Sequence, residues 1–200
     1  MPATRTTKRR GETRQRLLDT ALEVFAERGF GQTTIEQLCD AAGYSRGAFY
    51  SNFSSLDEVF LAMWEQQSAA YLTALREAQV SETESPEDAV IALLDLVPVD
   101  DRWYRLTAEF TAHSLRHPAL RRVMVARETA IQETILAILE GPIARFGRVI
   151  PDPDALAQAL VAVHDGTTVQ CLLDPDNPEV WQRRRALFLH TLDAYTQETQ

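Results

Sequence analysis

Apolar residues recur in this chain with the 3.6-residue period of an α-helix, and no segment alternates apolar and polar residues as a half-buried strand does. Proline, glycine or both separate the periodic segments, as at Gly141-Pro142. The pattern therefore predicts an all-α fold. Beyond residue 54 we expect helices at about 55–79, 86–97, 101–116, 118–140, 153–173 and 178–196.

Three shorter helical segments precede position 54. The first carries apolar residues at i, i+3, i+4 and i+7 and should end at Gly29, because glycine readily adopts the left-handed conformation that terminates a helix. The second should begin at Thr33, since Thr33 and Glu36 have the spacing of a capping box, and it should end at Gly43. A third, short helix should follow with Ser45 as its N-cap.

The second and third segments are separated by a turn of about three residues, which is the arrangement of a helix-turn-helix. Phe49 and Phe53, one turn apart, would anchor the third helix from behind. Its outer face suits the major groove, since arginine contacts guanine, asparagine contacts adenine and tyrosine reaches a phosphate. The amides at the start of the second helix favour a phosphate as well. Candidate DNA contacts are Thr33, Thr34, Arg46, Gly47, Tyr50, Ser51 and Asn52; the alternative is a pair of helices that merely connects larger elements.

The distribution of charge separates the start of the chain from the rest. The formal net charge is −9, yet residues 1–53 carry eight basic and six acidic side chains, and residues 1–16 carry six basic and one acidic. A basic arm at residues 1–10 that leads into a short domain is typical of a nucleic-acid reader with a separate second domain. We expect Lys8, Arg9 and Arg10 to follow the DNA backbone, whereas the alternative is a polar tail without function.

Composition excludes several other classes of protein. With 200 residues, 45% of them hydrophobic, the chain builds a core without a metal or disulfide staple. Its longest apolar run, Ala89 to Leu94, is far too short to cross a membrane, and no apolar segment of a secretory signal follows the basic start. Cys39 and Cys171 lie inside apolar helical patterns, which indicates a reducing compartment. We expect a cytoplasmic protein without a cofactor.

Residues 13–60, which read TRQRLLDTALEVFAERGFGQTTIEQLCDAAGYSRGAFYSNFSSLDEVF, resemble the DNA-binding domain of the TetR (tetracycline-repressor-like) family of bacterial transcriptional regulators. The resemblance implies a homodimer of nine or ten helices per subunit, a variable ligand-binding C-terminal domain, and repression of a double-stranded DNA operator that a small molecule relieves. It also implies functional positions at Thr34, Ser45, Arg46, Gly47, Ala48, Tyr50, Ser51 and Asn52.

One position departs from the family pattern. Members of the family usually place a lysine that contacts a phosphate at the start of the fourth helix, where this chain has Leu56. Its neighbours Asp57 and Glu58 are acidic and do not replace that contact. We expect the basic arm to compensate. The predicted domains are the arm at 1–10, the helix-turn-helix domain at 11–54, and a ligand-binding and dimerisation domain at 55–200.

The last two helices are candidates for the dimer interface. Each carries an apolar stripe, and two such helices from each of two subunits would form a four-helix bundle. The expected interface residues are Leu160, Val163, Thr167, Trp181, Phe188 and Leu192. The alternative for such stripes is packing within one chain.

A ligand pocket is expected between the fourth and eighth helices, which is the usual place within a bundle. Its candidate lining is rich in aromatic residues and includes a methionine, and it therefore favours a small apolar or aromatic effector. The candidates are Trp64, Trp103, Phe110, His113, Met124 and His164; plain core packing is the alternative for each of them.

Three further functions are weighed against this one. Glu109, His113 and His117 are spaced at i, i+4 and i+8, so adjacent pairs offer metal ligands and a metal-responsive regulator is an alternative. A nucleophilic pair of His164 and Cys171 is disfavoured, because the two positions lie two turns apart along a helix. No phosphate-binding loop or nucleophile motif is present, so we do not expect an enzyme. An architectural DNA-binding protein without an effector also remains.

Overall fold

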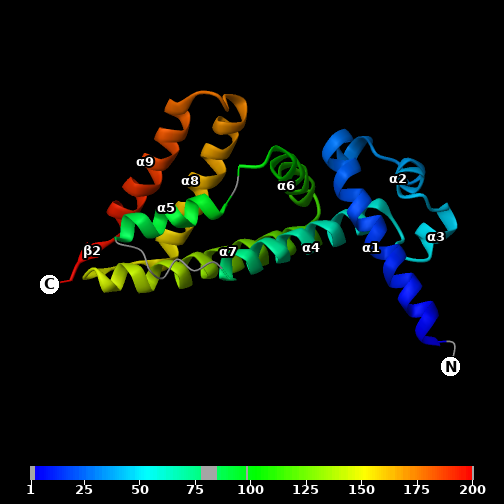
Figure 1. Cartoon of the computed structure of the whole chain (residues 1–200), viewed down its shortest axis with the longest axis horizontal. Helices are drawn as coiled ribbons and strands as arrows, with labels where there is room; N and C mark the ends of the chain where they lie inside the picture. Colours follow the sequence, from blue (N-terminus) through cyan, green and yellow to red (C-terminus); the bar gives the residue numbers. More distant parts are fainter. Residues whose placement is uncertain (1–2, 78–84, 98, 200) are drawn as a thin grey trace. The chain divides into compact units, whose positions relative to one another are not determined.

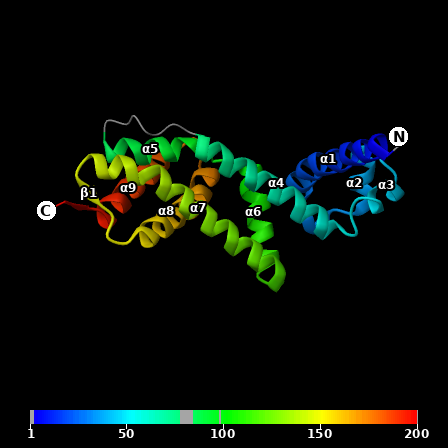
Figure 2. The ribbon, with the colours of Figure 1, turned by 90° about the horizontal axis from the view of Figure 1, so that it is seen from below.

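The structure is a computed structural model, which describes residues 3–77, 85–97 and 99–199, with side chains from Arg9 onward. The all-α fold is confirmed (Figure 1). The helices follow in the order α1 (Ala3–Arg28), the 3-10 helix η1 (Phe30–Gln32), α2 (Ile35–Ala42), α3 (Arg46–Tyr50), α4 (Leu56–Glu77), α5 (Pro86–Leu96), α6 (Asp101–Ser114), α7 (Pro118–Arg145), α8 (Pro153–Leu173) and α9 (Pro178–Tyr195). The two-residue strands β1 (Arg148–Val149) and β2 (Gln197–Glu198) pair antiparallel. Figure 2 shows β1 near the C-terminal end of the chain. None of the described helices is both long and apolar enough to span a membrane.

The chain forms two compact units. The first comprises Met1–Ala69 and Arg105–Arg116, and the second comprises Ala70–Tyr104 and His117–Gln200. This division differs from the boundary that we predicted at 54/55. The reason lies in aromatic packing, because Phe60 of α4 contacts Phe25 of α1 at a centroid distance of 5.3 Å and Phe110 of α6 at 5.5 Å. The first half of α4 and most of α6 therefore belong to the first unit.

The start of α2 lies one residue later than its expected capping box. Thr34, not Thr33, is the N-cap, and its hydroxyl accepts from the amide of Gln37, whose side chain in turn accepts from the Thr34 amide. Thr33 is buried and donates its hydroxyl to the carbonyl of Gly29, closing the turn around η1. The predicted pair of Thr33 and Glu36 was therefore wrong, because η1 lengthens the turn that precedes α2.

Several other predicted helix ends are confirmed, whereas the predicted end at residue 79 lies outside the described residues. Gly43 ends α2 in the left-handed conformation (φ +72°), and the Ser45 hydroxyl accepts from the amide of Ala48 at the start of α3. The predicted end of α7 at residue 140 was wrong, because the helix continues through Pro142 to Arg145. A proline near the end of a helix removes only one backbone hydrogen bond, and here its ring is buried beside other core residues.

Most of the residues expected at the dimer interface lie in the core of the second unit. Leu160, Phe188 and Leu192 are buried together in this core, with residues of α5 and α7. Thr167 is buried as well and bonds to α9. These four side chains are covered within their own chain, because the α8 and α9 stripes pack against each other and against α5 and α7. Val163 is partly buried against the same core.

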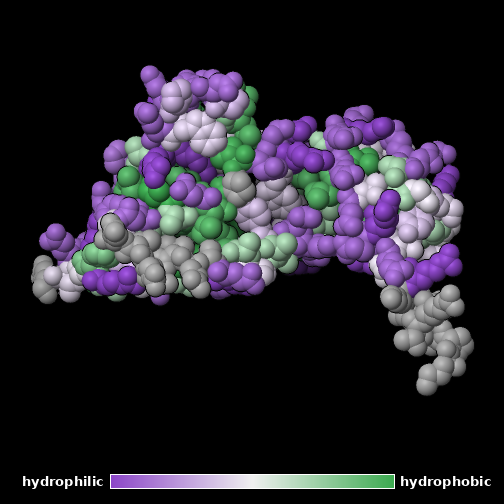
Figure 3. Space-filling view, in the orientation of Figure 1, coloured by the Kyte–Doolittle hydropathy of each residue, from purple (hydrophilic) through white to green (hydrophobic). Residues whose placement is uncertain are grey.

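Other apolar side chains of α8 and α9 face solvent. Leu173 is 81% exposed, Leu187 43% and Trp181 39%. Figure 3 shows hydrophobic residues gathered along α8 at the molecular surface. Trp181 also donates its indole N–H to the carbonyl of Pro175, which fixes the turn between the two helices. Of the six predicted interface residues, Trp181 is thus the one that lies clearly at the surface.

Candidate functional site

The short helix α3 is held from behind by two buried rings. Phe49 and Phe53 are both buried, as the sequence predicted, with their ring centroids 6.1 Å apart. The guanidinium carbon of Arg14 on α1 lies 5.0 Å from the centroid of the Phe53 ring, so it covers that ring from the side of α1. A helix of five residues gains its stability from such packing, since it is too short to be stable alone.

The opposite face of α3 is open to solvent. Arg46, Gly47 and Ser51 are exposed, and Tyr50 is 52% exposed although it is a large aromatic residue. A hydrogen bond with the Tyr50 side chain is the main cause that raises the pKa of Arg46, so the two side chains lie together on this face. The structure therefore places a cation and an aromatic hydroxyl side by side at the surface, where a phosphate or a base edge can meet them.

Gly47 has no internal reason to be glycine. Its φ is not positive, and a Cβ at this position would meet nothing closer than the Ser45 hydroxyl, at 3.7 Å. Glycine inside a helix costs roughly 0.5–1 kcal/mol relative to alanine. The open space above Gly47 instead lets an external surface approach the backbone of α3 closely.

Asn52 points less clearly outward than the sequence indicated. Its side chain is half-buried, and its amide nitrogen donates to the carbonyl of Ala48 at 2.8 Å. The hydroxyl of Ser51 similarly donates to the carbonyl of Gly47 at 2.8 Å. An adenine contact by Asn52 would require its amide to leave the helix backbone, and its role as a direct base reader stays a prediction.

The N-terminal basic segment is helical and touches α3. Residues 3–10 are the first turns of α1, so the predicted arm is an extension of that helix. Arg10 donates to the carbonyl of Ser51 at 2.7 Å, a contact across 41 residues that sequence reasoning missed. Arg9 is exposed. The side chain of Lys8 lies outside the described residues.

Position 56, where the family usually has a lysine, lies at the start of α4. Leu56 is the first residue of α4, and the Glu58 carboxylate accepts from both the amide and the hydroxyl of Ser54 at 2.7 Å. These two hydrogen bonds lower the pKa of Glu58. The acidic Glu58 thus stabilises the start of α4, and no basic side chain stands at position 56.

Two polar contacts fasten α6 to the rest of the first unit. The Glu109 carboxylate accepts from the amide of Phe30 at 2.7 Å, and Nε2 of His113 lies 3.0 Å from Oδ1 of Asp57. His117 belongs to the second unit. Among the described residues, no group of three or more His, Cys, Asp or Glu side chains is arranged to hold a metal ion.

The six predicted pocket residues divide between the two units. Trp64 and Phe110 are buried and stacked at a centroid distance of 4.2 Å in the first unit, which also holds His113. The second unit holds Trp103, Met124 and His164, and Trp103 stacks on Tyr71 of α4 at 6.4 Å. Their joint role in one pocket therefore stays a prediction.

A buried polar cluster joins α8 to α9, and its central residue, Arg184, was not among the predicted site residues. Arg184 of α9 is only 3% exposed, and its guanidinium contacts the Thr167 hydroxyl at 2.5 Å and Nδ1 of His164 at 2.9 Å. Burial, aided by Arg184 and Arg127, lowers the pKa of His164 from 6.5 to about 4. Burial also raises the pKa of the Cys171 thiol, which disfavours a thiolate nucleophile on this helix.

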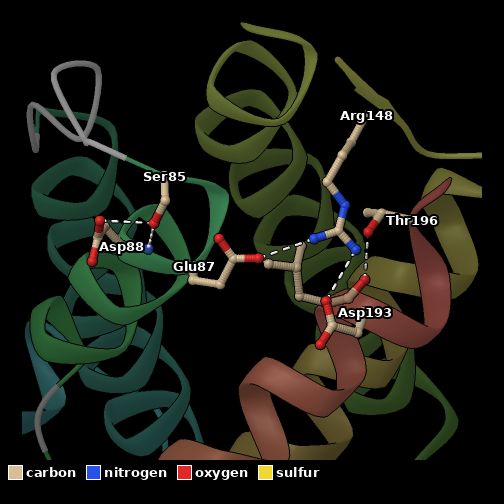
Figure 4. Close-up of polar contacts among 7 residues, drawn as sticks. Ser85, Glu87, Asp88, Arg148, Asp193 and Thr196 are labelled. Atoms are coloured by element: carbon tan, nitrogen blue, oxygen red, sulfur yellow. Dashed lines mark hydrogen bonds and ion pairs between the residues drawn. The ribbon is translucent and has the colours of Figure 1, made fainter. Parts of the chain in front are cut away.

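At the other end of the second unit, Arg148 ties three elements together (Figure 4). From β1 it donates to Glu87 on α5 and to Asp193 on α9, both at 3.0 Å. A cavity of about 680 Å³ lies beside it, lined by Ser85, Pro86, Glu87, Phe146, Gly147, Arg148, Asp193, Thr196, Glu198 and Thr199. Because both carboxylates are already paired with Arg148, this end of the unit acts as a structural junction.

Comparisons with known proteins bear on both parts of the chain. Residues 17–63 match the family described as bacterial regulatory proteins, tetR family, and residues 82–197 match the family described as BetI-type transcriptional repressor, C-terminal. The transcriptional activator FasR of Mycolicibacterium smegmatis is 33% identical over 103 residues, which are 50% of this chain and 47% of that protein. The chain thus matches about half the length of this relative.

Two further proteins match over most of the chain. The transcriptional repressor AcnR of Corynebacterium diphtheriae is 27% identical over 157 residues, covering 76% of this chain and 77% of the relative. A transcriptional regulator from Saccharomonospora viridis, solved in complex with choline, shares the fold with a TM-score of 0.75 and 21% identity. That match covers 88% of this chain and 94% of the other.

Proposed function

The chain belongs to the TetR family of bacterial regulatory proteins, and from that premise we propose that it is a ligand-responsive repressor of transcription. In this proposal a homodimer binds a palindromic DNA operator through α3, and a small apolar or aromatic molecule releases it. The protein acts in the cytoplasm, where the operator DNA lies.

The exposed face of α3 carries the proposal. Arg46 and Tyr50 lie together at the surface, Gly47 leaves the backbone approachable, and Phe49 and Phe53 hold the helix rigidly from the interior. A rigid helix with an arginine at its exposed start suits the major groove, where arginine grips guanine with two hydrogen bonds. Arg9 and Arg10 of α1 supply contacts to the DNA backbone in place of the lysine that Leu56 replaces.

The exposed apolar residues of α8 and α9 support the homodimer. Leu173, Leu187 and Trp181 present apolar surface that a second copy would bury. Two copies related by a twofold axis would present two α3 helices, and half-sites one helical turn apart match that arrangement. These three residues replace the four buried ones in the proposed interface.

Regulation by an effector rests on the second unit and on two helices that are continuous across the boundary. Residues 82–197 match a repressor C-terminal family, and the related S. viridis regulator was solved with choline. Helices α4 and α6 each begin in one unit and end in the other, so they are the covalent link from effector to DNA-binding domain. An effector releases DNA only if it binds the DNA-incompetent state more tightly.

The test is selection of bound fragments from a sheared genomic library, with purified full-length protein at near-physiological salt. The proposal predicts recovery of a shared palindrome with half-sites about one helical turn apart. Recovery of fragments with no shared sequence, and loss of all binding as salt rises, would overturn it. That outcome would indicate an architectural protein that contacts only the DNA backbone.

A further inference from the structure

A buried arginine at the α8–α9 contact bonds only to neutral groups. Nη1 of Arg184 lies 3.2 Å from the carbonyl of His164 and 2.5 and 3.2 Å from the hydroxyls of Thr167 and Thr168, and Nη2 lies 2.9 Å from Nδ1 of His164. Within the described part of the chain, none of the ion pairs involves this guanidinium. Its positive charge is therefore buried without a direct counter-charge, an arrangement that proteins rarely maintain.

The two threonine hydroxyls do not require this arginine as a partner. The Thr167 hydroxyl donates to the carbonyl of Val163 at 2.6 Å, and the Thr168 hydroxyl donates to the carbonyl of His164 at 2.8 Å. Both hydroxyls thus have acceptors within α8. They would keep these hydrogen bonds if an apolar residue occupied the position of Arg184. The burial of a guanidinium here therefore calls for another explanation than the support of α8.

The imidazole of His164 adds a second hydrogen-bond donor. Its Nδ1 faces a guanidinium N–H and must accept, so the ring proton lies on Nε2. Burial is the main cause that lowers the pKa of His164 to about 4, so the ring is neutral at physiological pH. The opposite edge of the ring consequently presents an N–H donor.

A second arginine and an aromatic pair lie in the same region. The Arg127 side chain of α7 is only 16% exposed, and its charge, like the charge of Arg184, lowers the pKa of His164. Both arginines also act on the pKa of Tyr71, which burial raises to about 12, and the Tyr71 ring stacks on Trp103. Tyr71 of α4 packs against the core that contains Phe188 of α9, and the Arg184 guanidinium lies 5.4 Å from the centroid of that Phe188 ring, so these side chains share one region of the second unit.

Two carboxylates offset part of this positive charge. Glu128 is paired with Arg127 at 3.1 Å, and Asp165 is exposed at the edge of the centre. Arg184 is the deeper of the two arginines, and Tyr71 and Trp103 are partly exposed. One further anionic group beside Arg184 would balance the remaining positive charge.

We propose that Arg184, Arg127, His164 and Tyr71 form an anion centre that binds the carboxylate of the effector, an aromatic or apolar carboxylic acid whose ring lies against Tyr71 and Trp103. The inference rests on the proposed function in one respect only, because it identifies the bound anion with the effector that releases DNA. The centre itself does not depend on DNA binding.

The first test compares two probes that differ in charge and hardly in shape. Benzoate should raise the Tm of the full-length protein and change its tryptophan fluorescence, and neutral benzamide at the same concentration should do neither. Arg184→Met should weaken benzoate binding roughly 10- to 100-fold, because a charge-assisted hydrogen bond is lost. Arg183→Met is the matched control, because Arg183 lies on the same helix and pairs with Glu179 at the surface.

The proposal is overturned if neither probe binds the wild type, if both bind equally, or if Arg184→Met retains wild-type affinity for benzoate. A second measurement excludes a purely structural role. The Tm of ligand-free Arg184→Met should equal or exceed that of the wild type, because a buried charge is replaced by an apolar side chain of similar length. A fall of more than roughly 4 °C would identify Arg184 as a clamp between α8 and α9 and would also overturn the proposal.

Measurements of DNA affinity separate this inference from the function on which it rests. Benzoate should lower the affinity of the wild type for its selected operator and leave the affinity of Arg184→Met unchanged. Benzoate binding without any effect on DNA affinity would support the anion centre and contradict the effector role. Failure to select an operator would overturn the repressor function and leave the probe experiment intact.

Discussion

At the scale of single residues, Arg46 is where specificity is expected to reside. It begins α3, is fully exposed and lies beside Tyr50. We predict that Arg46→Ala lowers affinity for the selected operator roughly 5- to 150-fold, the range of a lost bidentate base contact. Affinity for random DNA should fall much less. Fluorescence anisotropy with both duplexes measures the ratio, and an equal loss on the two would make Arg46 a phosphate contact.

Gly29 is a residue whose conformation other residues do not readily adopt. It joins α1 to η1 with φ +84° and ψ 148°, a region that is almost confined to glycine. A Cβ there would also lie 2.9 Å from Oε1 of Glu109, the carboxylate that accepts from Phe30. We predict that Gly29→Ala lowers the free energy of unfolding by roughly 1–3 kcal/mol in urea titrations.

The control for this substitution is Gly31→Ala, two residues along the same turn. Gly31 has no positive φ, and a Cβ there would meet no atom within 4 Å. Its free energy of unfolding should change by less than about 0.5 kcal/mol, as at ordinary surface positions. Equal effects of the two substitutions would contradict the conformational account of Gly29.

At the scale of elements, the first ten residues are expected to provide affinity without specificity. Residues 3–10 are helical turns of α1, and Arg10 bonds to the carbonyl that follows α3. Deletion of residues 1–10 should weaken binding to operator and random duplexes alike and flatten the dependence of log affinity on log salt, because phosphate contacts are lost. Titrations at several salt concentrations measure the slope, and an unchanged slope would exclude these residues from the DNA contact.

Helix existence could be predicted from periodicity, whereas some helix ends and faces could not. The turn around Gly29 contains a 3-10 helix that no sequence pattern announces, and it displaces the cap of α2 to Thr34. Pro142 reads as a helix end, but its burial keeps it within α7. An apolar stripe such as the one that contains Leu160 is expected both in a core and at a subunit interface. The structure shows that Leu160 is buried within the chain.

At the scale of the whole molecule, burial of His164 should make stability depend on pH. Its pKa is about 4 in the folded protein and 6.5 when unfolded, so below pH 6.5 the unfolded chain binds a proton that the folded chain does not. Stability is thus full above pH 6.5 and falls as the pH approaches 4. The loss from this group between pH 7.5 and 5.0 should be roughly 2 kcal/mol.

Urea unfolding of the wild type and of His164→Gln at both pH values isolates this contribution, because the other titrating groups are common to the two proteins. His164→Gln should lose this part of the pH dependence of stability. The control is His190→Gln, at an exposed position, which should keep the pH dependence of the wild type. Identical pH dependence of the wild type and His164→Gln would contradict the buried neutral imidazole.

The parts of the candidate site that depend on distant contacts lay beyond the sequence. The outward face of α3 follows from local spacing and was predicted, as was the burial of Phe49 and Phe53. Arg184 stands between Arg183 and Arg185, in a run of arginines that would be expected to reach solvent, so its burial against His164, 20 positions earlier, became visible only in the fold. The contact of His113 with Asp57 is of the same kind.

The most direct test of the central claim uses the operator that genomic selection provides. The affinity of the protein is measured for that duplex and for one in which five base pairs are inserted between the half-sites. Half a helical turn places the half-sites on opposite faces of the DNA. If two α3 helices of one dimer read them together, the insertion should reduce affinity to near that of random DNA. Equal affinity for the two duplexes would contradict a dimeric reader.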